Sequence, residues 1–173
     1  GRVLVQPIYQ GTYERFRAPV DFAVASRLQR LWLGWPWDVG RTIGYLETRA
    51  DIHAKRIGYL GVSFGGAFPM HLVALEPRFR AALLLAGGGV IIPLAAPIDA
   101  VHYLPRIKIP VLQMNGRFDY VVPIESQKAF FDLLGTPAAD RRLVTVDSGH
   151  VVPRSDALRE SLPWLDQYLG AAR

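Results

Sequence analysis

Residues 56–66 read RIGYLGVSFGG and decide the fold class of this chain. Residues 56–60 form a short apolar run, which indicates a buried strand, and residues 65–76 follow the pattern of a helix. Between them, Gly61-Val62-Ser63-Phe64-Gly65 has the G-x-S-x-G spacing that sets a serine on a sharp strand-to-helix turn. Glycines on either side of the serine let the strand and helix backbones pass close together. This stretch therefore predicts a nucleophile elbow with Ser63 at its tip.

Strands and helices alternate along the rest of the chain. The strand cores are apolar on both faces, which is typical of a parallel sheet covered by helices. We expect an α/β fold in one domain over residues 1–173, with a mostly parallel sheet of about five strands and helices on both faces. The strands are expected at 3–6, 56–60, 81–86, 110–114 and 143–146, and the helices at 23–33, 36–49, 65–76, 123–134 and 156–169. Pro36 is expected at the start of its helix, whereas Pro69 is expected to tighten or kink the helix at 65–76.

A serine hydroxyl needs a base to become a nucleophile, and the sequence offers one beyond the last predicted strand. His150 lies in Asp147-Ser148-Gly149-His150, and Asp119 lies in the NGRFDYVVP turn after the strand at 110–114. The order serine, acid, histidine is that of α/β-hydrolases. The carboxyl ends of parallel strands meet at one edge of the sheet, so we expect Ser63, Asp119 and His150 to form a catalytic triad. The backbone amide of Phe64 is the candidate oxyanion donor.

Other polar residues near these positions are expected to be structural. Asp147 is close to His150 in sequence and is expected to brace its turn. Of the remaining histidines, His53 and His71 are expected at the surface or in packing, and His102 is the one whose loop could face the pocket. No cluster of histidine, aspartate and glutamate has the spacing of a metal site, so we expect no metal and no cofactor.

Composition limits the other classes of function. The formal net charge is +5, but the arginines are scattered, and no basic stripe or reading motif for nucleic acid is present. There is no cysteine, which excludes disulfides and thiol catalysis. The opening GRVLVQPIY does not have the pattern of a signal peptide, and glycines and prolines interrupt the uncharged stretch at 81–98, so we expect no membrane span. The composition does not decide the cellular compartment, and the cytoplasm is slightly favoured.

These residues resemble the α/β-hydrolase superfamily over essentially the whole chain. More narrowly, PIYQGTYER, DVGRTIGYLETR, ALEPRFRA and NGRFD are similar to the dienelactone-hydrolase-like esterase domains, some of which are fused to bacterial serine/threonine kinases. The resemblance implies a carboxylesterase-type serine hydrolase that works through an acyl-enzyme intermediate. Dienelactone hydrolases proper use a cysteine nucleophile, so a serine at position 63 argues against that specific activity.

The chain departs from the family at its start. Members have a strand followed by an HGG-like or PG-like loop, which supplies the second oxyanion amide, and nothing here matches it. RVLVQPIYQG instead resembles the following strand of the family. We therefore expect the chain to be the C-terminal part of a hydrolase whose first strands, first helix and oxyanion loop lie upstream. The alternative is a minimal fold in which Val3–Gln6 moves beside the Ser63 strand and an amide near residues 7–10 acts as donor.

Substrate and partners are less sharply defined by the sequence. Tyr120 and His102 are the candidate substrate-binding side chains, and the lack of a cap domain after Ser63 favours small or medium esters. A peptidase of the prolyl-oligopeptidase type would share the triad order, and a non-catalytic hydrolase-like binding module is the alternative from another class. We expect no nucleic-acid or membrane partner, and either a homo-oligomer or a missing N-terminal segment.

Overall fold

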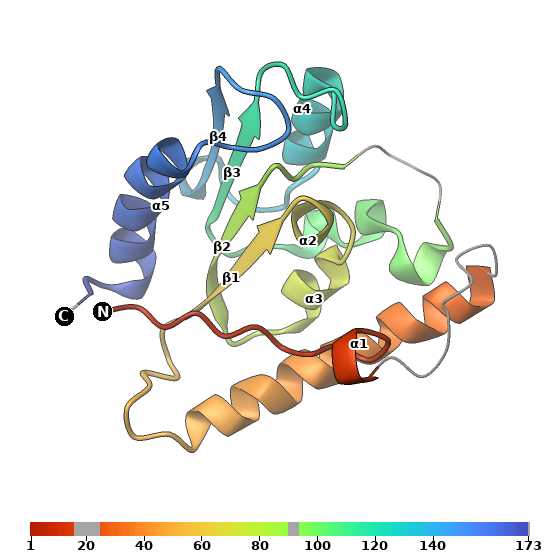
Figure 1. The fold of residues 1–173 in the computed structure, drawn as a ribbon, viewed down its shortest axis with the longest axis vertical. Coiled ribbons are helices and arrows are strands. Elements are labelled where there is room, and N and C mark those ends of the chain that lie inside the picture. Colours follow the sequence, from red (N-terminus) through yellow and green to blue (C-terminus); the bar gives the residue numbers. More distant parts are fainter. Residues whose placement is uncertain (16–24, 90–93, 173) are drawn as a thin grey trace.

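A four-stranded parallel sheet forms the centre of the molecule (Figure 1). The computed structural model describes residues 1–15, 25–89 and 94–172, without the side chains of residues 25–28. The strands are β1 (Ile57–Val62), β2 (Phe79–Leu85), β3 (Val111–Gly116) and β4 (Arg141–Val146), and they lie in the order β1-β2-β3-β4. Every pair of neighbours is parallel. All six residues of β3 are buried, as expected of an inner strand that is covered on both faces.

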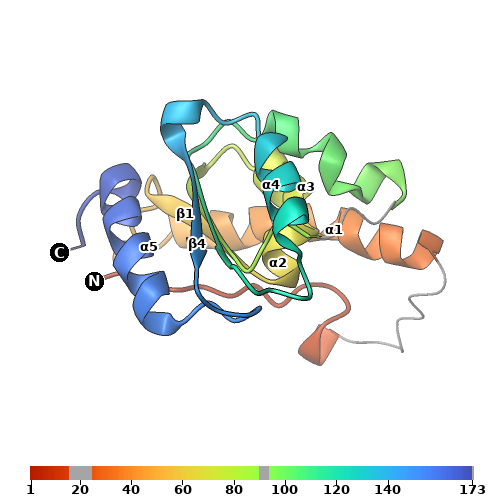
Figure 2. The same cartoon turned by 90° about the horizontal axis from the view of Figure 1, so that it is seen from above.

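Helices cover both faces of the sheet (Figure 2). α5 (Arg154–Leu169) lies alone on one face, where Trp164 packs with Leu83 and Leu112. The other face carries α1 (Ala25–Glu47), α2 (Phe64–Ala67), α3 (Met70–Leu75) and α4 (Ile124–Asp132) over the larger of the two apolar clusters. Five short 3-10 helices complete the described elements: η1 (Tyr13–Arg15), η2 (Ala96–Ile98), η3 (Ala100–His102), η4 (Leu104–Arg106) and η5 (Ala138–Asp140). The predicted α/β class, with helices on both faces of a parallel sheet, is confirmed.

The predicted strand at Val3–Gln6 is wrong. These residues form no strand, and among the described residues β1 pairs only with β2, so the described sheet has four strands rather than five. The alternative in which Val3–Gln6 moves beside the Ser63 strand is therefore not what the structure adopts. A strand is stabilised by its neighbour's hydrogen bonds, and Val3–Gln6 has no such neighbour.

Prolines set the helix boundaries differently from expectation. The two helices predicted on either side of Gly34 are one helix, α1, with Pro36 inside it, and the predicted residues 23 and 24 lie outside the described residues. The helix predicted at 65–76 is divided into α2 and α3 at Phe68 and Pro69, consistent with the local disturbance expected from a proline.

A buried histidine compensates for Pro36. Proline has no N–H, so the carbonyl of Trp32, four residues earlier in α1, loses its helical donor. The Nε2 atom of His71 in α3 lies 3.0 Å from that carbonyl oxygen and donates to it. His71 is fully buried, and its Nδ1 atom has no hydrogen-bond partner in the described structure. The predicted packing role of His71 is thus to let α1 continue through a proline.

Candidate active site

Ser63 sits at the turn between β1 and α2 in a strained backbone conformation. Its φ is 50° and its ψ is −111°, in a region that non-glycine residues rarely occupy. The close passage of strand and helix explains Gly61, because a Cβ atom there would lie 2.3 Å from the carbonyl oxygen of Gly65. A Cβ atom at Gly65 would meet nothing closer than 3.8 Å. The hydroxyl of Tyr59 donates to the Gly65 carbonyl at 2.7 Å and anchors the turn from below.

Asp119 lies in the turn after β3, with its side chain fully buried. Its Oδ1 atom accepts hydrogen bonds from the amides of Val121 and Val122, both at 2.9 Å, which leaves Oδ2 for another partner. The buried side chain of Gln127 in α4 ties the two ends of this turn together. Its Nε2 atom donates to the carbonyl of Gly116 at 3.1 Å and to that of Val122 at 2.7 Å. Gln127 is not among the residues predicted from sequence, because a glutamine in a helix gives no local signal of such a contact.

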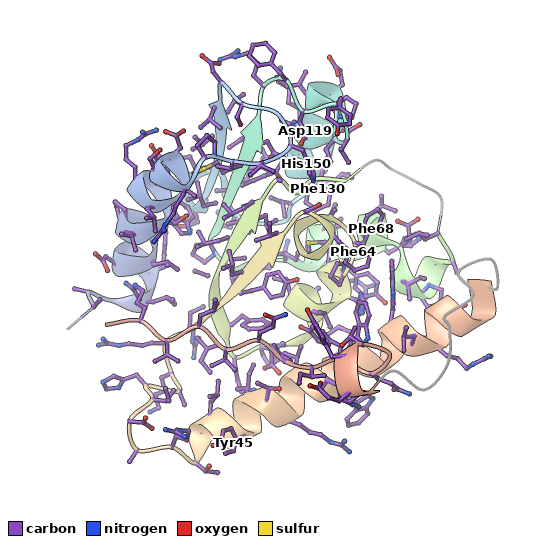
Figure 3. The ribbon with its side chains drawn as sticks, in the orientation of Figure 1. Tyr45, Phe64, Phe68, Asp119, Phe130 and His150 are labelled. Carbon is purple, nitrogen blue, oxygen red and sulfur yellow. The ribbon has the colours of Figure 1, made fainter. Side chains whose placement is uncertain are left out.

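His150 completes a hydrogen-bonded chain across three loops. Its Nδ1 atom lies 2.8 Å from Oδ2 of Asp119, and its Nε2 atom lies 2.7 Å from Oγ of Ser63. Asp119 and His150 are seen side by side at the upper edge of the sheet (Figure 3). The tautomer with a proton on Nδ1 lets the imidazole donate to the carboxylate and accept from the serine hydroxyl.

Backbone contacts hold the Asp119 and His150 turns against each other. The amide of Phe118 donates to the carbonyl of Ser148 at 2.9 Å. A Cβ atom at Gly116 would lie 1.9 Å from the carbonyl of Gly149, so only glycine permits this approach. Arg117 pairs with Asp147 at 2.8 Å on the surface, which agrees with the bracing role expected of Asp147.

Phe64 follows Ser63 directly and has an unpaired backbone amide and a half-exposed ring in the described structure. Its amide donates to no acceptor in the described part of the chain, so it is available to a ligand beside Ser63. Its half-exposed ring packs edge-on against Trp32, with centroids 5.3 Å apart, and lies 5.2 Å from the ring of Phe68. Figure 3 shows Phe64 and Phe68 beside each other below Asp119 and His150. The ring is therefore packed against Trp32 and Phe68 on one side and exposed to solvent on the other.

The other candidate residues lie outside the hydrogen-bonded chain. Tyr120 follows Asp119, and 87% of its surface is exposed. His102 is exposed on η3 and has no hydrogen bond or ion pair to the triad within the described ranges. The amide of Gln10, one of the second oxyanion donors considered, instead donates to Asp38 at 2.9 Å.

The described residues contain neither a metal-ion cluster nor a helix suited to cross a membrane. Residues 1–15, 25–89 and 94–172 hold no group of three or more histidine, cysteine, aspartate or glutamate side chains arranged for a metal ion. Among the helices of these same ranges, none combines the length and the apolar character required to span a bilayer.

Solved structures with a similar fold include two esterases and a putative dienelactone hydrolase. A cold-adapted esterase from an Arctic intertidal metagenomic library, bound to PEG, has a TM-score of 0.69 and 20% identity, covering 93% of this chain and 67% of that one. A putative dienelactone hydrolase from Klebsiella pneumoniae has a TM-score of 0.65 and 17% identity, with 82% and 64% covered. Acetyl xylan esterase 1 from Thermoanaerobacterium has a TM-score of 0.62 and 20% identity, with 80% and 54% covered. The chain thus spans about two thirds or less of these structures.

The family is identified by sequence. The chain has no match among curated proteins. The profile of the dienelactone hydrolase family matches residues 3–145, which is most of the chain and includes Ser63 and Asp119. The chain therefore belongs to the dienelactone hydrolase family.

Proposed function

We propose that this chain carries the catalytic triad of a serine hydrolase that cleaves carboxylic esters. The observation that supports the proposal best is the continuous chain of hydrogen bonds from the Ser63 hydroxyl through His150 to the buried Asp119 carboxylate. The strained turn at Ser63 adds to it, because such strain is found where a side chain must be aimed at a substrate.

The reaction follows from these positions. The Oγ atom of Ser63 attacks the ester carbonyl carbon while its proton passes to Nε2 of His150. The tetrahedral oxyanion accepts a hydrogen bond from the Phe64 amide. When the intermediate collapses, the C–O bond to the alcohol breaks and His150 gives its proton to the leaving oxygen, which leaves an acyl group on Ser63. Water then attacks that ester, with His150 again taking and returning the proton, and releases the acid.

Asp119 has an orienting and electrostatic role in this scheme. Its Oδ2 atom fixes the imidazole of His150 with the proton on Nδ1 and stabilises the imidazolium that forms in each half of the reaction. The two backbone amides that donate to Oδ1 hold the carboxylate in place. No cofactor or metal ion takes part in these steps.

A complete oxyanion hole needs a second donor. Loss of one donor costs about 100- to 1000-fold in turnover, and the Gln10 amide is already committed to Asp38. We place the second donor in a part of the polypeptide upstream of residue 1, which makes this chain the C-terminal part of the hydrolase domain. Residues 1–173 alone are then expected to turn over esters slowly while Ser63 remains chemically reactive.

Small or medium esters fit the surroundings of Ser63. The half-exposed ring of Phe64 offers an apolar wall beside the nucleophile, and the exposed ring of Tyr120 belongs to the residue after Asp119. We assign Tyr120 and His102 to substrate binding outside the chemical step. Replacing either by alanine is expected to raise KM and to leave kcat within about twofold, since such residues bind ground and transition states alike.

Labelling by a fluorophosphonate probe tests the enzyme against the non-catalytic alternative. Wild-type protein and a Ser155→Ala control, altered at an exposed serine of α5, are expected to incorporate the probe, and Ser63→Ala is expected to lose all labelling. A folded wild-type protein that resists the probe would support the binding module instead. Hydrolysis of p-nitrophenyl acetate without cleavage of peptides separates the esterase from a prolyl-oligopeptidase-type peptidase.

A further inference from the structure

The carbonyl of Gly65 lies in α2 but lacks its helical donor. In an α-helix this carbonyl would accept from the amide four residues later, and that residue is Pro69, which has no N–H. Phe68 has helical backbone angles and donates to the Phe64 carbonyl at 3.0 Å, so the helix continues up to the point where the next donor is missing. The turn after Ser63 therefore needs a donor from outside α2.

The hydroxyl of Tyr59 is that donor, and it lies 2.7 Å from the Gly65 carbonyl oxygen. Tyr59 stands on β1 and is 9% exposed, and its ring packs edge-on against Phe79 with centroids 5.6 Å apart. Burial raises the pKa of the Tyr59 hydroxyl above its ordinary value of 10, and the nearby Tyr9 adds to the effect. The hydroxyl is therefore a protonated donor in neutral solution, on a side chain that the sheet holds in place.

The hydrogen bond from Tyr59 is the first in a row that ends at the candidate oxyanion donor. The peptide group between Gly65 and Gly66 accepts from Tyr59 through its carbonyl. The N–H of the same peptide group donates to the Ser63 carbonyl at 2.9 Å. That carbonyl belongs in turn to the peptide group whose N–H is the Phe64 amide. The Phe64 amide is thus the last group of the row, and it has no acceptor among the described residues.

Such a row of hydrogen bonds has two effects on the amide at its end. Hydrogen bonds in a chain polarise one another, by about 10–30% per bond, so a peptide carbonyl that accepts makes its own N–H a stronger donor. The row also fixes the peptide plane that follows Ser63, whose φ of 50° is a strained value that persists only where the surroundings hold it. An oxyanion donor is effective only if it is already aimed when the charge forms. Both effects require a donor at the Gly65 carbonyl.

We propose that Tyr59 is a positioning residue for the oxyanion donor: its hydroxyl replaces the N–H that Pro69 lacks and, through the two peptide groups just described, orients and strengthens the Phe64 amide. This inference rests on the proposed ester hydrolysis, because only a reaction through an oxyanion uses that amide. The alternative is that Tyr59 only stabilises the fold. In that case its loss would lower Tm without changing how the folded protein treats the carbonyl oxygen of its substrate.

Tyr59→Phe in the full-length natural protein removes the hydroxyl and keeps the ring. The matched control is Tyr103→Phe, because the Tyr103 hydroxyl also donates to a backbone carbonyl six residues away, that of Pro97, at 2.8 Å. The measurement is kcat/KM for p-nitrophenyl acetate and for its thiono analogue, in which sulfur replaces the carbonyl oxygen, at a temperature where thermal unfolding shows each variant folded. Since sulfur is a weak hydrogen-bond acceptor, the ratio of the oxygen value to the sulfur value reports the strength of oxyanion donation.

We expect this ratio to fall roughly 10-fold in Tyr59→Phe, which is part of the 100- to 1000-fold that a whole oxyanion donor supplies, and to stay within about twofold in the control. A second substitution tests whether the bond to Gly65 carries the effect. Pro69→Ala restores an N–H at the position from which an α-helix donates to the Gly65 carbonyl, and the helical angles of Phe68 direct it there. The double variant, Tyr59→Phe with Pro69→Ala, is therefore expected to recover most of the wild-type ratio without the hydroxyl.

Two results would overturn the proposal and leave the esterase reaction in place. If kcat/KM of Tyr59→Phe falls by the same factor for both substrates, or does not fall, the ratio is unchanged and Tyr59 has no role at the oxyanion. If the ratio falls but the double variant does not recover it, the bond to the Gly65 carbonyl is not the cause. Failure of the proposed function itself is seen before any substitution, as a folded wild-type protein that hydrolyses neither substrate and resists fluorophosphonate.

Discussion

Replacing Gln127 with methionine would show whether the Asp119 turn is positioned by the buried amide beneath it. Methionine has a similar length and volume but cannot donate a hydrogen bond. The Gln127→Met variant would therefore leave the carbonyls of Gly116 and Val122 without their donor in a buried site. Since these carbonyls bracket the turn that carries Asp119, the expected effects fall on both stability and Ser63 reactivity.

The stability change can be worked out from the contacts. Each buried carbonyl left unsatisfied costs about 1–3 kcal/mol. The variant also removes the Oε1 atom of Gln127, which is buried without a partner. Removing this unsatisfied acceptor stabilises the variant by an amount of the same order, about 1–3 kcal/mol. The net loss is about 1–3 kcal/mol, which corresponds to a fall in Tm of roughly 2–12 °C for a chain of this length.

The effect on reactivity has a different origin. If the turn relaxes, Oδ2 of Asp119 moves relative to His150, and a displacement of about 1 Å in a catalytic group costs roughly 100-fold in rate. We expect Gln127→Met to label with fluorophosphonate about 10- to 100-fold more slowly than wild type, and to show a lower kcat with little change in KM. The assay is the second-order rate of Ser63 labelling at a temperature where thermal unfolding shows the variant folded.

Gln113 provides a matched control. It is also fully buried, its Nε2 atom also makes two hydrogen bonds, to Asn115 and to the Gln127 carbonyl, and its Oε1 atom also has no partner. Gln113→Met should lose similar stability with a much smaller change in the labelling rate, because its contacts are with Asn115 and the Gln127 carbonyl and leave the donors to the Gly116 and Val122 carbonyls in place. Equal labelling rates for the two folded variants would refute a positioning role for Gln127.

Three other perturbations test the site and its scaffold. Asp119→Asn keeps the turn but offers an amide donor to Nδ1 of His150, which forces the wrong tautomer of the imidazole. We therefore expect kcat to fall by about 10⁴-fold without loss of Tm. An unchanged kcat would remove Asp119 from the mechanism. Gly61→Ala places a Cβ atom 2.3 Å from the Gly65 carbonyl, whereas Gly65→Ala has 3.8 Å of space, so only the first should unfold or lose several degrees of Tm in a melting experiment. Burial lowers the pKa of His71 below its ordinary value of 6.5 and outweighs the hydrogen bond to Trp32, which raises it. Below about pH 6.5 the unfolded chain therefore binds a proton at His71 that the folded chain does not bind. The free energy of unfolding should be at its full value above about pH 6.5 and fall below it. His71→Gln keeps a donor for the Trp32 carbonyl but does not titrate, so its Tm should fall less between pH 6.5 and 5, and an identical pH dependence in the two proteins would contradict a neutral His71.

Four of the five predicted strands and the meeting of Ser63, Asp119 and His150 at one edge could be read from the sequence. The reason is that they depend on local signals: apolar runs of strand length, each followed by a glycine-containing turn or loop. Parallel topology then brings the ends of these strands to a common edge whatever the details of packing. The strand predicted at Val3–Gln6 has the same kind of local signal but fails, because a strand exists only where a neighbour offers its hydrogen bonds, and none of the four described strands pairs with these residues.

The features that could not be predicted from sequence are hydrogen bonds from a side chain to a backbone carbonyl on another element. Pro36 signals a helix start when it is read alone, yet α1 continues through it because His71 donates to the carbonyl that the proline leaves open. Gln127 ties the Asp119 turn in the same manner, through carbonyls that no sequence pattern marks as needing a donor. Both side chains carry an unpartnered buried atom in the described structure, so each is kept at a cost in free energy. The backbone contacts of each residue explain its presence despite this cost. His71 allows α1 to continue through Pro36, and Gln127 holds the turn that directs Asp119 towards His150.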